Sequence, residues 1–132
     1  MKQIDNKQDL AIGENNQLQS IEGIWENVYE ETKLIQLIRF YMVDSQIYIE
    51  VFAKGKSALI AWGRKVCELY YESVNTTKIV GLIARYDVGF MENLVYLNIT
   101  HGLLVVQLYC KFKDNSNRQD YFAREFFVKK KN

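Results

Sequence analysis

The chain has 132 residues, of which 48% are hydrophobic, 25% are charged and 14% are aromatic, and it contains no proline. This length is typical of one domain, whose core buries roughly two-thirds of the surface of the unfolded chain. The formal net charge is +1 at pH 7, so no global field attracts a polyanion, and we expect no nucleic-acid partner.

The hydropathy of the chain bears on its location. Residues 1–20 are polar and lack the apolar core of a signal peptide. No apolar stretch approaches the roughly 18 residues that a membrane-spanning helix needs. We therefore expect a cytoplasmic protein with no membrane partner.

Two regions of the chain differ in composition. Residues 1–20 are rich in Asn, Gln, Asp and Lys, a composition that is typical of a flexible arm. From Ile21 onward, apolar and polar residues alternate, as in a strand with one face inward. The sequence therefore predicts a flexible polar arm over residues 1–20 and one folded domain over residues 21–132.

Strand-like runs joined by short turns fill the predicted domain. The runs 34–43 and 46–53 are separated by Asp44-Ser45, which fits a two-residue hairpin connection. Further strands are expected over residues 21–29, 58–62, 66–71, 78–86, 92–99, 103–112 and 120–129. Short connections favour an all-β fold, a single antiparallel meander barrel of about eight strands, over its alternative, a sandwich.

Three motifs stand out: GIWEN at residues 23–27, YDVGF at residues 86–90 and FKDNSNRQDY at residues 112–121. Together they resemble the motifs of a poorly characterised bacterial family of small lipocalin-like, or calycin-type, β-barrel domains. The first motif also resembles the start of avidin-type barrels. The resemblance implies a barrel in which Trp25 plugs one end of the core and Gly23 allows a close backbone approach. It implies no established activity.

The last two of these motifs also have a purely structural interpretation. Asp114, Asn115, Ser116 and Asn117 are turn-forming residues whose side chains bond nearby backbone amides. Gly89 suits the positive φ angle of a hairpin corner. We therefore favour a hairpin role for both motifs over a binding role.

The middle of the chain departs from the family pattern. Residues 54–63 (KGKSALIAWG) keep the lysine, tryptophan and glycine of the family's central stretch but lack its cysteines, histidine and aspartates. Thiol or metal chemistry is therefore impossible in this stretch. Cys67 and Cys110 lack metal-ligand spacing, and His101 lies in a predicted turn. We expect no catalytic residue, no metal and no cofactor; an enzyme is the least favoured alternative.

The barrel interior is the candidate functional site. Eight strands can enclose one small ligand, but side chains can also fill such a barrel, and the sequence leaves both outcomes open. Our first hypothesis is a module that binds a small apolar ligand inside the barrel. The candidate ligand-binding residues are Trp25, Tyr29, Phe40, Trp62, Arg85, Tyr86, Tyr121 and Phe127.

A different class of function is a protein-interaction or self-associating structural domain, such as a homodimer. The alternation that points Ile38 and Phe40 inward leaves apolar side chains on the opposite faces of the strands, where a neighbouring subunit would cover them. The outward residues that carry this alternative are Ile35, Leu37, Tyr41, Phe52, Val105 and Tyr109.

Overall fold

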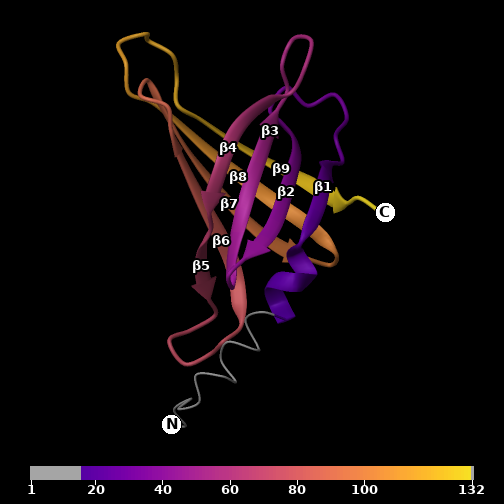
Figure 1. Cartoon of the computed structure of the whole chain (residues 1–132). Coiled ribbons are helices and arrows are strands. Elements are labelled where there is room, and N and C mark those ends of the chain that lie inside the picture. Colours follow the sequence, from indigo (N-terminus) through magenta and orange to yellow (C-terminus); the bar gives the residue numbers. More distant parts are fainter. Residues whose placement is uncertain (1–15, 132) are drawn as a thin grey trace.

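A computed structural model of the chain describes residues 16–131 as an antiparallel sheet that curls into a nearly closed barrel (Figure 1). The sheet order is β4-β3-β2-β1-β9-β8-β7-β6-β5, so neighbours in sequence are neighbours in space and β1 pairs with β9. The predicted all-β meander barrel is confirmed. The strands are β1 (Gly23–Asn27), β2 (Ile35–Val43), β3 (Gln46–Ala53), β4 (Ile60–Val66), β5 (Glu68–Tyr71), β6 (Ile79–Asp87), β7 (Met91–Thr100), β8 (Leu103–Phe112) and β9 (Tyr121–Lys129).

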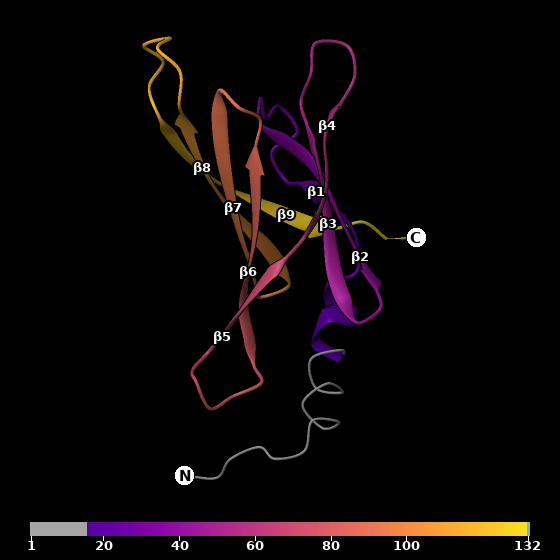
Figure 2. The same ribbon diagram turned by 60° about the vertical axis from the view of Figure 1, so that its left-hand side comes forward.

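The chain between β3 and β6 is divided into two short strands, β4 and β5. β4 and β5 are separated by Cys67 alone, yet β4 pairs with β3 and β5 pairs with β6, at opposite ends of the sheet order. Figure 2 shows the chain crossing from the β3 side of the barrel to the β6 side at this point. β4 and β5 thus act as one bent strand that bridges the two sheet edges, and the sheet has nine strands where about eight were predicted.

Side chains close the seam between β4 and β6, which are not neighbours in the hydrogen-bonded sheet. The Tyr86 hydroxyl on β6 donates a hydrogen bond of 3.1 Å to the carbonyl of Gly63 on β4. The rings of Trp62 and Tyr86 meet edge to face, with their centroids 5.5 Å apart. This contact holds the two edges together where no backbone ladder does.

A β-bulge near the start of β2 changes which side chains face the core. The register with β3 shifts between Ile35 and Leu37, so Gln36 is an extra residue on β2. Ile35 therefore faces inward with Ile38 and is only 2% exposed. The prediction that Ile35 faces outward was wrong, because strict alternation holds only while the register has no inserted residue.

One end of the barrel is closed by a helical turn over residues 16–21. Leu18 and Ile21 of this turn are buried in the core. Trp25 on β1 is 3% exposed, and its indole Nε1 donates a hydrogen bond of 2.8 Å to the carbonyl of Ile21. Trp25 therefore fastens the helical turn to the first strand at this end.

The expected N-terminal arm is described only for residues 16–20, which are helical and contribute Leu18 to the core. Residues 1–15 lie outside the described part of the chain, so the flexible arm stays a prediction there.

Candidate functional site

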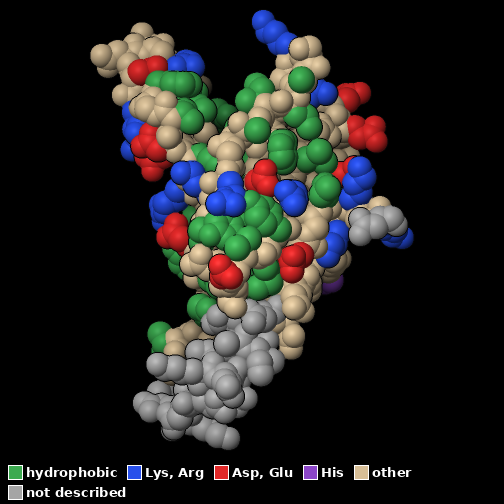
Figure 3. All heavy atoms as spheres, viewed as in Figure 1, with side chains coloured by type: hydrophobic (Ala, Val, Ile, Leu, Met, Phe, Trp, Pro, Cys, Tyr) green, Lys and Arg blue, Asp and Glu red, His purple; other side chains and the backbone are tan. Residues whose placement is uncertain are grey.

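The barrel end opposite the helical turn carries long loops. The loops over residues 54–59 and 113–120 project as two separate lobes, and a notch opens between them in the space-filling view (Figures 1 and 3). Hydrophobic side chains gather below this notch. We call this end the open end of the barrel and the end covered by residues 16–21 the closed end.

A small cavity lies between the start of β2 and the inner faces of β8 and β9. Its volume is about 10 Å³, which is the space that roughly one water molecule occupies. Side chains thus fill the barrel around this position. The cavity is lined by Leu34, Ile35, Val106, Leu108, Ala123, Glu125 and Phe127.

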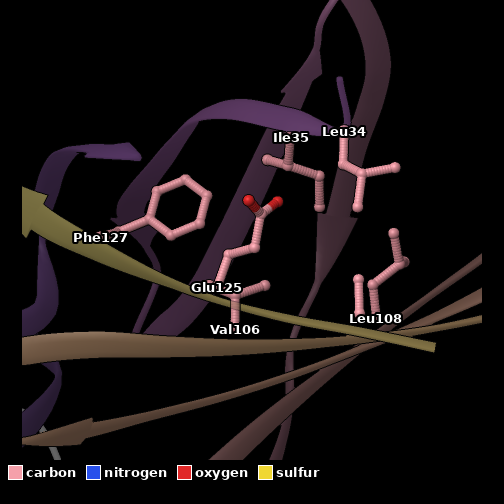
Figure 4. A pocket seen from close by; sticks show the side chains of 7 residues that line it. Leu34, Ile35, Val106, Leu108, Glu125 and Phe127 are labelled. Carbon is pink, nitrogen blue, oxygen red and sulfur yellow. The ribbon is translucent and has the colours of Figure 1, made fainter. Parts of the chain in front are cut away.

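Glu125 is the one charged residue of this lining, and its carboxylate projects into the space between Phe127 and Ile35 (Figure 4). The Thr32 hydroxyl donates a hydrogen bond of 2.8 Å to Glu125 Oε1. The same hydroxyl oxygen accepts a hydrogen bond of 3.1 Å from the backbone N–H of Leu34. Thr32 is buried and held by both bonds, so it fixes the position of the carboxylate.

Alternation along β9 explains why Glu125 faces inward. Phe127 is fully buried, and residues two apart on a strand share a face, so Glu125 and Ala123 face the interior as well. Glu125 was missed among the candidate site residues. The sequence does contain a signal for this residue, because Glu125 has the same parity on the strand as Phe127, a large aromatic residue of the kind that marks the core-facing side.

A second polar group faces the interior nearer the open end. Asn93 on β7 is 1% exposed, and within residues 16–131 its side-chain oxygen Oδ1 has no hydrogen-bond partner. Such a group costs about 1–3 kcal/mol of folding free energy. Asn93 pairs in register with Tyr86 on β6 and with Cys110 on β8, and Cys110 pairs in turn with Tyr121 on β9. These four residues form one polar row across four strands.

Burial perturbs the titratable members of this polar row. Burial, together with a hydrogen bond between Tyr121 and Cys110, raises the pKa of Tyr121 to about 12. Burial also raises the pKa of the Cys110 thiol. Both groups are therefore neutral hydrogen-bonding groups near pH 7, and Cys110 is not an activated thiolate.

The structure brings five of the eight predicted ligand-binding residues to the barrel interior or its seam. Trp25 lies at the closed end, and Phe40 and Phe127 are fully buried in the core. Trp62 and Tyr86 form the contact across the seam. Of these five, Phe127 lines the small cavity.

The other three predicted residues lie elsewhere. Tyr121 belongs to the polar row and is partly exposed at the open end. Tyr29 is 57% exposed in the loop between β1 and β2. Arg85 is on the outer face of β6, where its Nε donates a hydrogen bond of 2.8 Å to Glu68, so it does not face the interior.

Residues 86–90 and 112–121 form a single side-chain cluster. The Arg118 guanidinium lies 4.3 Å from the centre of the Phe112 ring and 5.2 Å from that of Phe90. Lys113 pairs with Asp87 at 2.6 Å. These contacts join the hairpin corner at residues 86–90 to the loop at residues 113–120.

The outward residues of the interaction hypothesis do not form one patch. Leu37, Tyr41 and Phe52 lie on β2 and β3, whereas Val105 and Tyr109 lie on β8, and β1 and β9 stand between the two groups in the sheet. Val105 is only 2% exposed, so the prediction that it is available to a partner was wrong. The Tyr109 ring packs on Phe122 with centroids 5.0 Å apart.

Among residues 16–131, no three His, Cys, Asp or Glu side chains are placed to hold a metal ion. Within the same range, no helix has the length and apolar character that crossing a bilayer requires. Burial raises the pKa of Cys67 to about 12, so this thiol is protonated near neutral pH.

Comparisons of the chain with protein families, curated proteins and solved structures found no match.

Proposed function

We propose that this domain is a non-enzymatic binding module that takes a small, largely apolar ligand into the open half of its barrel. The observation that carries the proposal is the interior cavity between the start of β2 and strands β8 and β9, with six uncharged lining residues and one carboxylate. Trp25 and the helical turn occupy the opposite end, and we take the end between the loops over residues 54–59 and 113–120 as the route of entry.

The sequence resemblance supports the same function. The motifs at residues 23–27, 86–90 and 112–121 resemble those of small lipocalin-like domains, and lipocalin-type barrels hold one small ligand in their interior. The nearly closed antiparallel barrel is compatible with that fold. We include membership of this calycin-type bacterial family in the proposal.

Ligand entry requires the cavity to enlarge. Pockets for drug-sized ligands have volumes of about 300–1,000 Å³, whereas the present cavity has about 10 Å³. Leu34 is half-buried beside the flanking loop, and Ala123 presents a small side chain. Movement of Leu34 toward the loop would extend the cavity over Ala123 toward the open end.

The proposal is tested first by native mass spectrometry of protein purified from its own host. A retained small molecule is the expected result. The same spectrum gives the oligomeric state, so a homodimer without a ligand would favour the self-associating alternative instead.

A second test uses octanol as a defined apolar probe. Titration monitored by amide NMR should shift resonances of β8 and β9 in the wild type. Ala123→Leu fills the cavity and should remove these shifts, whereas Arg124→Leu adds the same side chain at the neighbouring, exposed position and should keep them. Ala123→Val replaces Ala123→Leu if the larger side chain prevents folding. Octanol shifts that survive filling of the cavity, or no shifts in the wild type, would overturn the proposal.

A further inference from the structure

Glu125 is half-buried on the inner face of β9, next to buried apolar residues. Its register neighbour on β8 is Val106, which pairs in turn with Leu97 on β7. Both neighbours are buried, and the cavity wall around the carboxylate is otherwise uncharged. An apolar side chain at position 125 would complete this row, so the carboxylate is not explained by packing.

The charge of Glu125 is not balanced by the described part of the chain. The ion pairs found among residues 16–131 engage Glu26, Glu50, Glu68, Glu72, Asp87 and Asp114, and none of them involves Glu125. The neighbouring cation, Arg124, lies over the Phe126 ring at 5.6 Å on the other face of β9. The hydrogen bond from Thr32 stabilises the carboxylate without neutralising it.

A carboxylate beside apolar side chains attracts a cation more strongly than the same group does in water, because the local dielectric constant is lower. It accepts several hydrogen bonds through its two oxygens, and the Thr32 hydroxyl uses one of these positions on Oε1. An ammonium group supplies both the positive charge and up to three donors. A carboxylate ligand would instead meet like-charge repulsion.

We infer that the ligand is a small amine with an apolar body, whose ammonium group pairs with Glu125 while the body lies against Leu108 and Ala123. This inference rests on the proposed function, because it specifies the ligand class for the same cavity. Thr32 is a positioning residue in this arrangement, since it holds Oε1 and leaves the carboxylate facing the cavity.

The test compares three probes with the same eight-carbon body: octylamine, octanol and octanoate. NMR titration of the wild type at pH 7 should give octylamine a dissociation constant roughly tenfold or more below that of octanol, with octanoate weakest. Glu125→Gln keeps the size and removes the charge, and should bring octylamine to within about twofold of octanol. Glu26→Gln removes a carboxylate from the outer face, where Glu26 pairs with Lys130 at 3.7 Å, and should keep the preference.

The outcomes separate the two proposals. If the wild type binds octylamine and octanol equally, or if Glu125→Gln retains the preference for octylamine, the inference fails and the proposed function stands. If the wild type binds none of the three probes, the proposed function itself fails. The wild-type comparison decides between these results even if Glu125→Gln does not fold.

Discussion

The Lys129 ammonium group lies 5.9 Å from the centre of the Trp25 ring. It also donates a hydrogen bond of 3.2 Å to the carbonyl of Ser20 in the helical turn. Gly23 has a φ of 127°, which other residues rarely adopt, and a Cβ atom there would lie 2.9 Å from Cε of the flexible Lys129 side chain. The last strand therefore joins the first strand and the helical turn at the closed end.

Replacement of Lys129 should weaken that closed end. Lys129→Met keeps the apolar stem but removes the ammonium group, and should lower the free energy of unfolding by about 1 kcal/mol through the lost cation–π contact and hydrogen bond. Urea denaturation measures the change. Lys130→Met is the control, because Lys130 is exposed and pairs with Glu26 at 3.7 Å. Equal effects of the two substitutions would show that the contact with Trp25 contributes nothing.

Local patterns of the sequence predicted most of the fold. The alternation of apolar and polar residues predicted the strands. Asp44-Ser45 forms the expected two-residue turn, with φ angles of 51° and 67°. The bulge at Gln36 could not be read from alternation, because it depends on pairing with β3. The passage from β4 to β5 likewise depends on the curvature of the whole sheet.

The candidate site was predicted less completely than the fold. Aromatic residues such as Trp62 and Phe127 were recognised as inward, because large apolar side chains mark a core strand. Glu125 and Thr32 were missed, since a carboxylate is expected in solvent and its hydrogen-bond partner lies 93 residues away in the sequence. Contacts across such a separation exist only once the barrel has closed.

The seam between β4 and β6 gives a second prediction. Tyr86→Phe keeps the ring contact with Trp62 but removes the hydrogen bond to the Gly63 carbonyl, and should lower the free energy of unfolding by about 1 kcal/mol. Amide hydrogen exchange in β4 should become faster. Tyr48→Phe is the control, because the Tyr48 hydroxyl makes an exposed contact of 3.4 Å with Gln46. Unchanged exchange in β4 would show that the hydroxyl does not hold the seam.

The buried thiol of Cys67 predicts a loss of stability in alkali. Burial raises its pKa to about 12, so the folded state keeps a proton that the unfolded chain loses above pH of about 8.5. The contribution of the Cys67 thiol to the free energy of unfolding is complete below about pH 8.5. It falls as the pH rises toward about 12, by at most about 1.4 kcal/mol per pH unit.

Denaturation of the wild type and of Cys67→Ala at several pH values measures this effect. The variant lacks the titrating group, so its deficit in unfolding free energy should shrink between pH of about 9 and 11. If the unfolding free energies of the two proteins changed in parallel with pH, Cys67 would be excluded as the source of the loss of stability in alkali. Titration of lysines affects both proteins alike and cancels in the difference.

Gly81 on β6 leaves room for the ring of Tyr96. A Cβ atom at position 81 would lie 2.5 Å from Tyr96 Oη and 2.8 Å from its Cζ. Gly81→Ala should therefore lower the free energy of unfolding by about 1–3 kcal/mol through overpacking. In a double-mutant cycle, Tyr96→Leu should recover part of that loss. Additive effects of the two substitutions would mean that the ring moves aside at no cost.

Asn93 gives the last prediction, because its buried Oδ1 has no partner among residues 16–131. Asn93→Leu has nearly the same shape and removes the unpaired oxygen, so the free energy of unfolding should stay equal or rise by about 1 kcal/mol. Asn98→Leu, at a half-buried position of the same strand, should change it by less than about 0.5 kcal/mol. A gain at position 93 would confirm that the buried Oδ1 is unpaired in the folded protein. A marked loss in the same urea titration would instead show that Oδ1 is satisfied within the folded protein.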